Sequence, residues 1–208
     1  LARMIVACIA EATAAAALAR MREARTLGAD VAELRADFLA PGEFDAAFAG
    51  GALPAIVTAR PAWEGGRWHG SEDDRIALLR EAARGGAEYV DVEFKAYKDF
   101  DRGCASLVVC WHDFDRTPED LDRLAGRMAA LEPALLKIAC LATGTGDLLR
   151  LVALQKRLPR PGSVIALFPE AVGTGQSYID TLAEIVKSRA VAERAARVLG
   201  YPSADVME

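Results

Sequence analysis

Apolar runs that suit buried strands alternate with amphipathic helical stretches along most of this chain. The predicted helices include residues 72–86 and residues 117–131, where Thr117 as N-cap and Pro118 at the first helical position predict the start. Strands that alternate with helices at this spacing form parallel sheets covered by helices. With a length of 208 residues, the chain is predicted to form one α/β domain over residues 1–208. The predicted strands cover residues 4–10, 31–37, 54–60, 88–94, 106–114, 135–142 and 163–168.

The side-chain period of two gives several predicted strands one polar and one apolar face. A parallel sheet in an open, doubly wound fold is apolar on both faces, with its polar groups at strand ends and in loops. A barrel instead gathers inward-facing polar groups toward the carboxyl ends of its strands, so we favour a barrel. The polar positions expected on the inner face are Glu33, Arg35, Asp37, Thr58, Arg60, Asp91, Glu93, His112 and Lys137.

The overall charge argues against two classes of partner. The chain has a net charge of −5 and a pI near 5.2, so we expect no binding of nucleic acid or of an anionic membrane. No apolar run approaches the roughly 18 residues of a membrane span. Glu11 interrupts the N-terminal apolar run, which therefore suits a strand and a helix better than a targeting signal. We expect a cytoplasmic protein.

Cysteine and histidine show no metal-binding pattern. The two histidines, His69 and His112, form no HxH or HxxxH pair, and no GxGxxG or Walker loop follows a predicted strand. We therefore predict no metal site. The four cysteines contain no CxxC pair, and we expect reduced thiols, buried where they lie in strands; they are Cys8, Cys104, Cys110 and Cys140.

Lys137 lies in the middle of the apolar run LLKIAC, residues 135–140. An apolar environment that lowers the pKa of a lysine from about 10.4 makes its amine a nucleophile toward carbonyl carbon. The alternative is a lysine whose ammonium reaches solvent or pairs with an interior carboxylate such as Glu93. The pattern alone leaves both interpretations open.

His112 ends the strand that precedes the lysine strand, where it could act as a base near pH 7. His69 lies in a glycine-flanked loop and is expected to be exposed. Glu64 could reach back from its loop to orient a histidine, or could simply be solvated. Glu33, Arg35 and Arg60 could hold a carboxylate or diol oxygens of a ligand, although a Glu33–Arg35 ion pair is an equally simple interpretation.

Four segments, taken in order, resemble type I 3-dehydroquinate dehydratases. They contain the elements ExRxD, RxxxEGG, HDFxxTP and KIA, within residues 29–39, 58–94, 110–121 and 135–142. The resemblance covers residues 4–168. It implies a (β/α)8 barrel that converts 3-dehydroquinate to 3-dehydroshikimate and water, in the shikimate pathway of aromatic amino acid biosynthesis, without a metal or organic cofactor.

The resemblance also implies roles for these side chains. Lys137 forms an imine with the C3 ketone, and His112 takes the C2 proton and later protonates the departing C1 hydroxyl. Glu64 orients the histidine. The residues expected to hold the substrate's hydroxyls and ring are Glu33, Arg35 and Arg60.

Residues 169–208 diverge from the family pattern. The family has a serine–arginine pair where this chain reads Ser177 and Tyr178, and that arginine is the main partner of the substrate carboxylate. Gln176, Ser177 and Arg189 are candidates to replace the contact, and we count Gln176 and Ser177 as substrate-binding residues. Residues 178–200 read as one amphipathic helix, so the eighth strand is predicted to be missing or atypical.

Two other functions stay open from the sequence. A Schiff-base lyase or aldolase would keep the lysine and accept another hydroxy-ketone, whereas a non-catalytic barrel would bind a ligand or partner without turnover. The apolar stripe of the predicted 178–200 helix could cover the end of the barrel or form a homodimer interface.

Overall fold

Seven parallel strands form one sheet, in the same order as along the chain, within the described residues 4–97, 100 and 105–167 of the computed structural model. The strands are β1 (Val6–Ile9), β2 (Val31–Arg35), β3 (Ala55–Thr58), β4 (Tyr89–Glu93), β5 (Ser106–Asp113), β6 (Leu135–Leu141) and β7 (Gly162–Leu167). The helices are α1 (Ala14–Leu27), α2 (Phe44–Ala49), α3 (Glu72–Arg84), α4 (Leu121–Ala129) and α5 (Thr145–Arg157), and a 3-10 turn η1 covers Ala62–Glu64.

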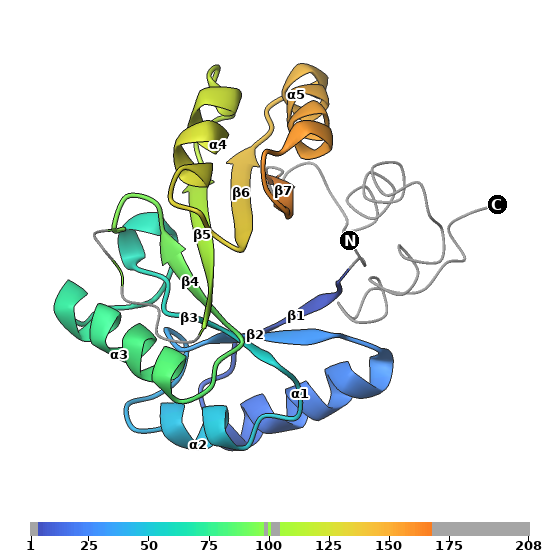
Figure 1. Ribbon diagram of the computed structural model, residues 1–208. Helices are drawn as coiled ribbons and strands as arrows, with labels where there is room; N and C mark the ends of the chain where they lie inside the picture. Colours follow the sequence, from blue (N-terminus) through green and yellow to red (C-terminus); the bar gives the residue numbers. More distant parts are fainter. Residues whose placement is uncertain (1–3, 98–99, 101–104, 168–208) are drawn as a thin grey trace.

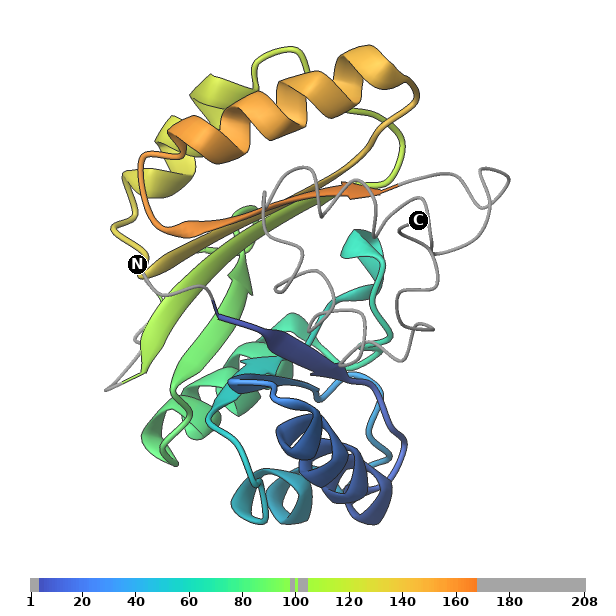
Figure 2. The same ribbon diagram turned by 90° about the vertical axis from the view of Figure 1, so that its right-hand side faces the viewer.

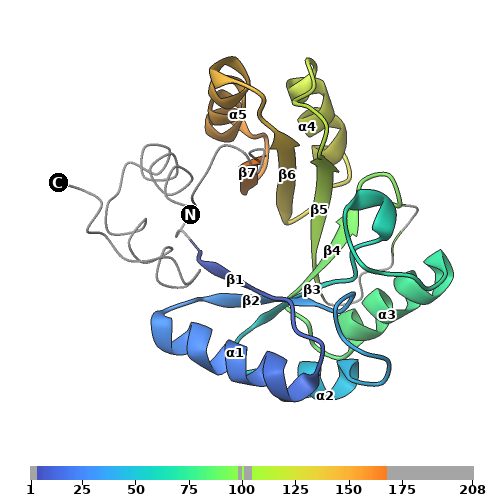
Figure 3. The same cartoon turned by 180° about the vertical axis from the view of Figure 1, so that it is seen from behind.

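The sheet curls around a common inner face, and the helices lie on its outer side (Figure 1). Views from the side and from behind show the same arrangement, with α1 and α2 outside the first strands and α4 and α5 outside the last (Figures 2 and 3). Each strand pairs only with its neighbours in sequence, so β1 and β7 are the two edges of the described sheet. This curled, incomplete barrel confirms the predicted barrel architecture.

The hydrophobic core lies between the sheet and its outer helices. One cluster packs Ala17 and Met21 of α1 against Leu34 of β2. The larger cluster joins residues of α3, α4 and α5 to the outward-facing residues of β3 to β6, for example Leu79 and Val90, both fully buried. Successive residues of a strand point to opposite faces of the sheet. The residues between these apolar ones therefore face the inside of the curled sheet.

The predicted start of the fourth helix is wrong. α4 begins at Leu121, and Thr117 does not cap it. Instead the Thr117 hydroxyl donates to the carbonyl oxygen of Leu141 at 2.8 Å, at the end of β6. This hydrogen bond holds the loop after β5 against β6, and Thr117 therefore lies in that loop, before the first residue of α4.

Cys110 and Cys140 are buried, as expected, but Cys8 is exposed. It lies on the edge strand β1, where Ala7 and Ile9 take the buried positions. Several predictions fall outside the described residues: Cys104, Gln176, Ser177, Tyr178, Arg189, the 178–200 helix with its dimer interface, and the eighth strand. Among the described helices, none has the length and apolar character that crossing a membrane requires.

Candidate active site

Lys137 projects from β6 toward two carboxylates on other strands. Its Nζ lies 2.8 Å from Oε1 of Glu33 on β2 and 3.2 Å from Oδ2 of Asp91 on β4. The side chain is 21% exposed. The interpretation in which the lysine pairs with an interior carboxylate is therefore confirmed, and its partners are Glu33 and Asp91 where Glu93 had been named as an example.

The pKa of Lys137 agrees with the interpretation in which the ammonium pairs with interior carboxylates. Burial lowers the pKa of the lysine, but Glu33 and Asp91 outweigh burial, so its pKa is raised above the ordinary value. The amine is thus held as an ammonium at rest. A nucleophilic role requires that a neighbouring group first take the proton.

The two carboxylates are themselves held by neighbouring strands. The Thr58 hydroxyl donates to Oε1 of Glu33 at 2.9 Å, and Nη2 of Arg60 donates to Oδ2 of Asp91 at 3.0 Å. Burial raises the pKa of Asp91, but Arg60 and Lys137 outweigh it and hold the carboxyl well below its usual range. Asp91 was placed on the inner face by sequence but was not among the predicted site residues. Asp91 and Glu93 alternate with valine in the sequence VDVE, and this pattern, which puts both on the same face of the strand, could have identified Asp91 as a site residue.

Arg60 lies at the centre of the buried charges and is only 4% exposed. Its Nη1 donates to Oε1 of Glu93 and to Sγ of Cys110, each at 2.6 Å, and lies 3.6 Å from Oε2 of Glu64. The guanidinium is therefore already committed to protein groups. Its predicted contact with a ligand stays a prediction.

Arg35 pairs with Asp37 rather than with Glu33. Its Nε and Nη2 donate to the two carboxylate oxygens of Asp37 at 2.9 and 2.7 Å, which is a bidentate ion pair. The backbone N–H of Arg67 donates to the same carboxylate at 3.0 Å. Arg35 is thus fixed at the end of β2, and Glu33 is left for Lys137.

His112 lies near the end of β5, next to the lysine strand, and contacts Glu64 of η1. Its Nδ1 is 3.1 Å from Oε2 of Glu64, whose side chain is 1% exposed. An Nδ1–H that donates to this carboxylate leaves Nε2 as the acceptor. The Phe114 ring stacks against His112, with 6.0 Å between ring centroids. The other histidine, His69, is exposed in its loop, as predicted.

The environment of His112 predicts its titration. Burial lowers its pKa and Arg60 lowers it further, whereas the hydrogen bond to Glu64 opposes both, and the net shift is downward from about 6.5. We therefore expect the imidazole to stay neutral as the pH falls through 6.5 and to become charged only below it. Proton NMR titration of the histidine C2 proton, assigned with His112→Ala, measures this midpoint.

The Glu64→Gln variant provides the matched control for this titration. Because the carboxylate favours the charged imidazole, its neutral isostere should move the His112 midpoint still lower. A midpoint above pH 6.5 in the unmodified protein would contradict the burial argument.

The glycines after Glu64 hold the turn that carries it. Gly65 has φ of +76°, a left-handed conformation that favours glycine. A Cβ on Gly66 would overlap the backbone carbonyl oxygen of Arg60. Both positions thus require glycine for Glu64 to reach His112.

Gly66→Ala is expected to destabilise the fold by about 1–3 kcal/mol, because the turn must shift away from the Arg60 backbone. Gly126→Ala is the control: this glycine lies inside α4 with nothing within 4 Å of an added Cβ, so alanine should stabilise by up to about 1 kcal/mol. Urea unfolding of both variants measures the difference. Equal stabilities would show that the turn tolerates a side chain.

Two groups of potential metal ligands occur among the described residues, and both include Cys110. Glu64, Cys110 and His112 form one, and Asp91, Glu93 and Cys110 form the other, with ligand atoms within 4.8 Å of one another. Arg60 donates to Asp91, Glu93 and Cys110. A guanidinium therefore already supplies the positive charge that these donors face.

Comparison with known proteins identifies the family. The model of the type I 3-dehydroquinase family matches residues 5–174. A 3-dehydroquinate dehydratase of Desulfotalea psychrophila is 31% identical over 155 residues, covering 69% of this chain and 68% of that protein. The bifunctional 3-dehydroquinate dehydratase/shikimate dehydrogenase of Arabidopsis thaliana is 32% identical over 152 residues, covering 67% of this chain but only 25% of the plant protein.

Solved structures agree on the fold. The 3-dehydroquinate dehydratase of Geobacillus kaustophilus superimposes with a TM-score of 0.68 at 24% identity, over 79% of this chain and 73% of that one. The type I enzyme of Clostridium difficile gives the same TM-score at 22% identity, over 79% and 75% of the two chains. The family model matches most of this chain, and together with these similarities that match shows that the chain belongs to the type I 3-dehydroquinase family.

Proposed function

We propose that this chain is a hydro-lyase that converts 3-dehydroquinate to 3-dehydroshikimate and water through an imine on Lys137. The observation that carries the proposal is that Lys137 lies on β6 beside β5, the strand that carries His112 with its contact to Glu64 of η1. An amine that can bind a carbonyl carbon and a base that can take a neighbouring proton are the two groups that this elimination needs. Membership of the family supports the substrate.

The reaction begins with the loss of a proton from the Lys137 ammonium. Glu33, whose Oε1 lies 2.8 Å from Nζ, is the nearest acceptor. The free amine then adds to the C3 ketone, and loss of water gives a protonated imine. Because the iminium carries the same positive charge as the ammonium, Asp91 at 3.2 Å can face it throughout.

The iminium draws electrons from C2, so that His112 can remove the C2 proton and leave an enamine. Collapse of the enamine expels the C1 hydroxyl, which leaves as water with the proton that His112 returns. Hydrolysis of the imine frees the product and restores the lysine. The net change is the loss of one water from the substrate.

Substrate binding is assigned to Glu33, Arg35 and Arg60, with Gln176 and Ser177 from the divergent segment. The proposal includes a cytoplasmic location, which the buried thiols of Cys110 and Cys140 support. A pKa of about 12 keeps Cys140 a thiol, since burial raises it.

The test is trapping with borohydride. The protein is incubated with 3-dehydroquinate and sodium borohydride, and the modified peptide is identified by mass spectrometry, with formation of 3-dehydroshikimate followed in parallel. An adduct on Lys137 together with product formation is expected. An adduct without product would instead favour another Schiff-base lyase, and a folded protein that forms neither would favour the non-catalytic barrel.

A further inference from the structure

Arg75 is a fully buried arginine on α3, the helix outside β3 and β4. Its Nη1 donates to the carbonyl oxygen of Ala59 at 3.1 Å and to Oε2 of Glu93 at 2.6 Å. Its Nε and Nη2 donate to Glu72, whose side chain is 47% exposed. Arginine is almost never fully buried without partners. Here one guanidinium forms hydrogen bonds both with the start of its own helix and with the ends of the two strands beneath it.

Glu93 divides its two oxygens between two arginines. Oε1 accepts from Arg60 and Oε2 accepts from Arg75, each at 2.6 Å, and the Glu93 side chain has no exposed surface. Nη1 of Arg60, the nitrogen that contacts Glu93, also lies 3.6 Å from Oε2 of Glu64, and its Nη2 lies 3.0 Å from Oδ2 of Asp91. Buried charges of alternating sign therefore run from α3 to the groups that contact Lys137 and His112.

This arrangement makes the position of Arg60 depend on Arg75. With Arg75 present, half of the Glu93 carboxylate is neutralised from outside the site. Without it, Glu93 would lose the contact that fixes its Oε2, and because burial already raises the pKa of this carboxyl to about 7, its negative charge and its hold on Nη1 of Arg60 would weaken. The Arg60 guanidinium would then shift toward Asp91 and Glu64, and the surroundings of the lysine and the histidine would change although neither touches Arg75.

We propose that Arg75 is a positioning residue of the active site, which shares Glu93 with Arg60 and so holds the Arg60 guanidinium between Asp91 and Glu64. The inference rests on the proposed function, because it assigns Arg75 a part in that reaction. The family resemblance assigned no role to Arg75.

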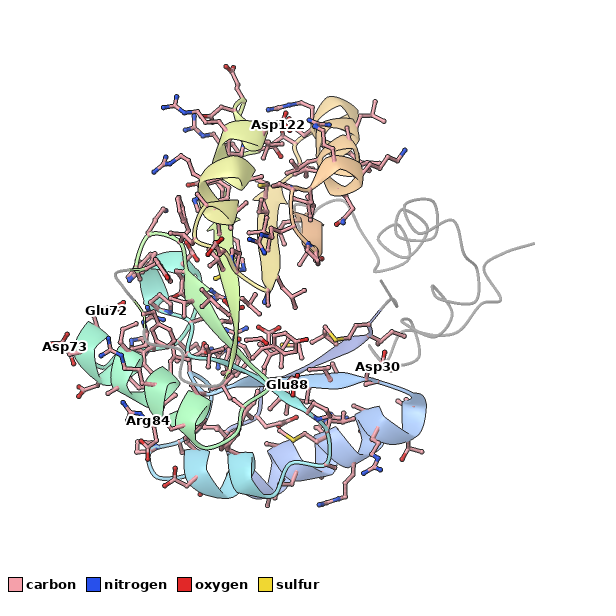
Figure 4. The ribbon with its side chains drawn as sticks, viewed as in Figure 1. Asp30, Glu72, Asp73, Arg84, Glu88 and Asp122 are labelled. Atoms are coloured by element: carbon pink, nitrogen blue, oxygen red, sulfur yellow. The ribbon has the colours of Figure 1, made fainter. Side chains whose placement is uncertain are left out.

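The experiment compares Arg75→Met and Arg75→Lys with the control Arg84→Met. Arg84 is an exposed arginine in the last turn of the same helix, far along it from Glu72 (Figure 4). We expect kcat/KM for 3-dehydroquinate to fall about 10- to 100-fold in Arg75→Met, by analogy with small displacements in other sites. Arg75→Lys should lie between the two, since lysine keeps the charge but not the fork of donors. Arg84→Met should match the unmodified protein.

A second readout does not depend on turnover. Arg60 lowers the pKa of His112, so an Arg60 that shifts toward Glu64 in Arg75→Met should lower the NMR titration midpoint of His112. His69 is the chain's other histidine and supplies the reference signal. An unmodified protein without turnover would contradict the proposed function, whereas an unchanged His112 midpoint in folded Arg75→Met would overturn the positioning role.

The double variant Arg75→Met/Glu93→Gln covers the case in which Arg75→Met does not fold. It leaves no unpaired charge where the pair was, so it should fold. We expect kcat/KM to stay at least about tenfold below wild type, because Arg60 has lost a charged partner. Wild-type kcat/KM in this variant would show that Arg75 and Glu93 only neutralise each other, and the inference would fail.

Discussion

Lys137→Ala is expected to reduce the dehydration of 3-dehydroquinate to the background rate, a loss of at least about 10⁴-fold, and to abolish the borohydride-stable adduct. The reason is that the amine is needed to form the iminium, which makes the C2 proton acidic. No other described lysine is placed between two interior carboxylates. Mass spectrometry of the trapped protein and a product assay measure the two effects.

Folding must be checked in the same variant, because Glu33 and Asp91 lose their ammonium partner. Asp91 keeps Arg60 at 3.0 Å and Glu33 keeps the Thr58 hydroxyl at 2.9 Å, so the fold should survive with reduced stability. Thermal unfolding followed by circular dichroism tests this. Lys156→Ala, which removes an exposed lysine of α5, is the matched control and should retain both turnover and the adduct. Turnover within tenfold of wild type in Lys137→Ala would contradict the imine mechanism.

The sequence predicted the parallel barrel and its inner polar face because both follow from local rules. Alternation of strands with helices leads to a parallel sheet, and a period of two assigns each residue of a strand to one face. Glu33, Asp91 and Lys137 were placed together on the inner face for this reason. His112 and Glu64 also lie within contact of each other, at 3.1 Å.

The sequence could not predict which inward-facing side chains meet. The contacts of Lys137 join residues 104 and 46 positions apart, and they depend on the register and curl of the sheet. A local apolar run therefore suggested a lowered lysine pKa, while the carboxylates that raise it come from distant strands. The prediction that Thr117 caps a helix was wrong for a related reason, because its hydroxyl donates to a strand-end carbonyl that is distant in the sequence.

His112→Ala is expected to lower kcat by about 10²- to 10⁴-fold, the usual contribution of a general acid–base group. The imine should still form on Lys137, since neither Glu33 nor Asp91 is changed and both carboxylates remain beside Nζ. The variant should therefore still give the borohydride adduct while product formation is slow. This combination separates the base from the nucleophile.

The control for this last variant is His69→Ala, which removes the exposed loop histidine and should leave kcat unchanged. If His112→Ala turns over at the wild-type rate, the base is another group, and the hydrogen bond between His112 and Glu64 serves only the fold. If instead it loses both product and adduct while folded, His112 is needed before the proton transfer, in imine formation itself. Because Nδ1 of His112 contacts Glu64, Nε2 is the nitrogen to which we assign the proton transfer in the unmodified protein.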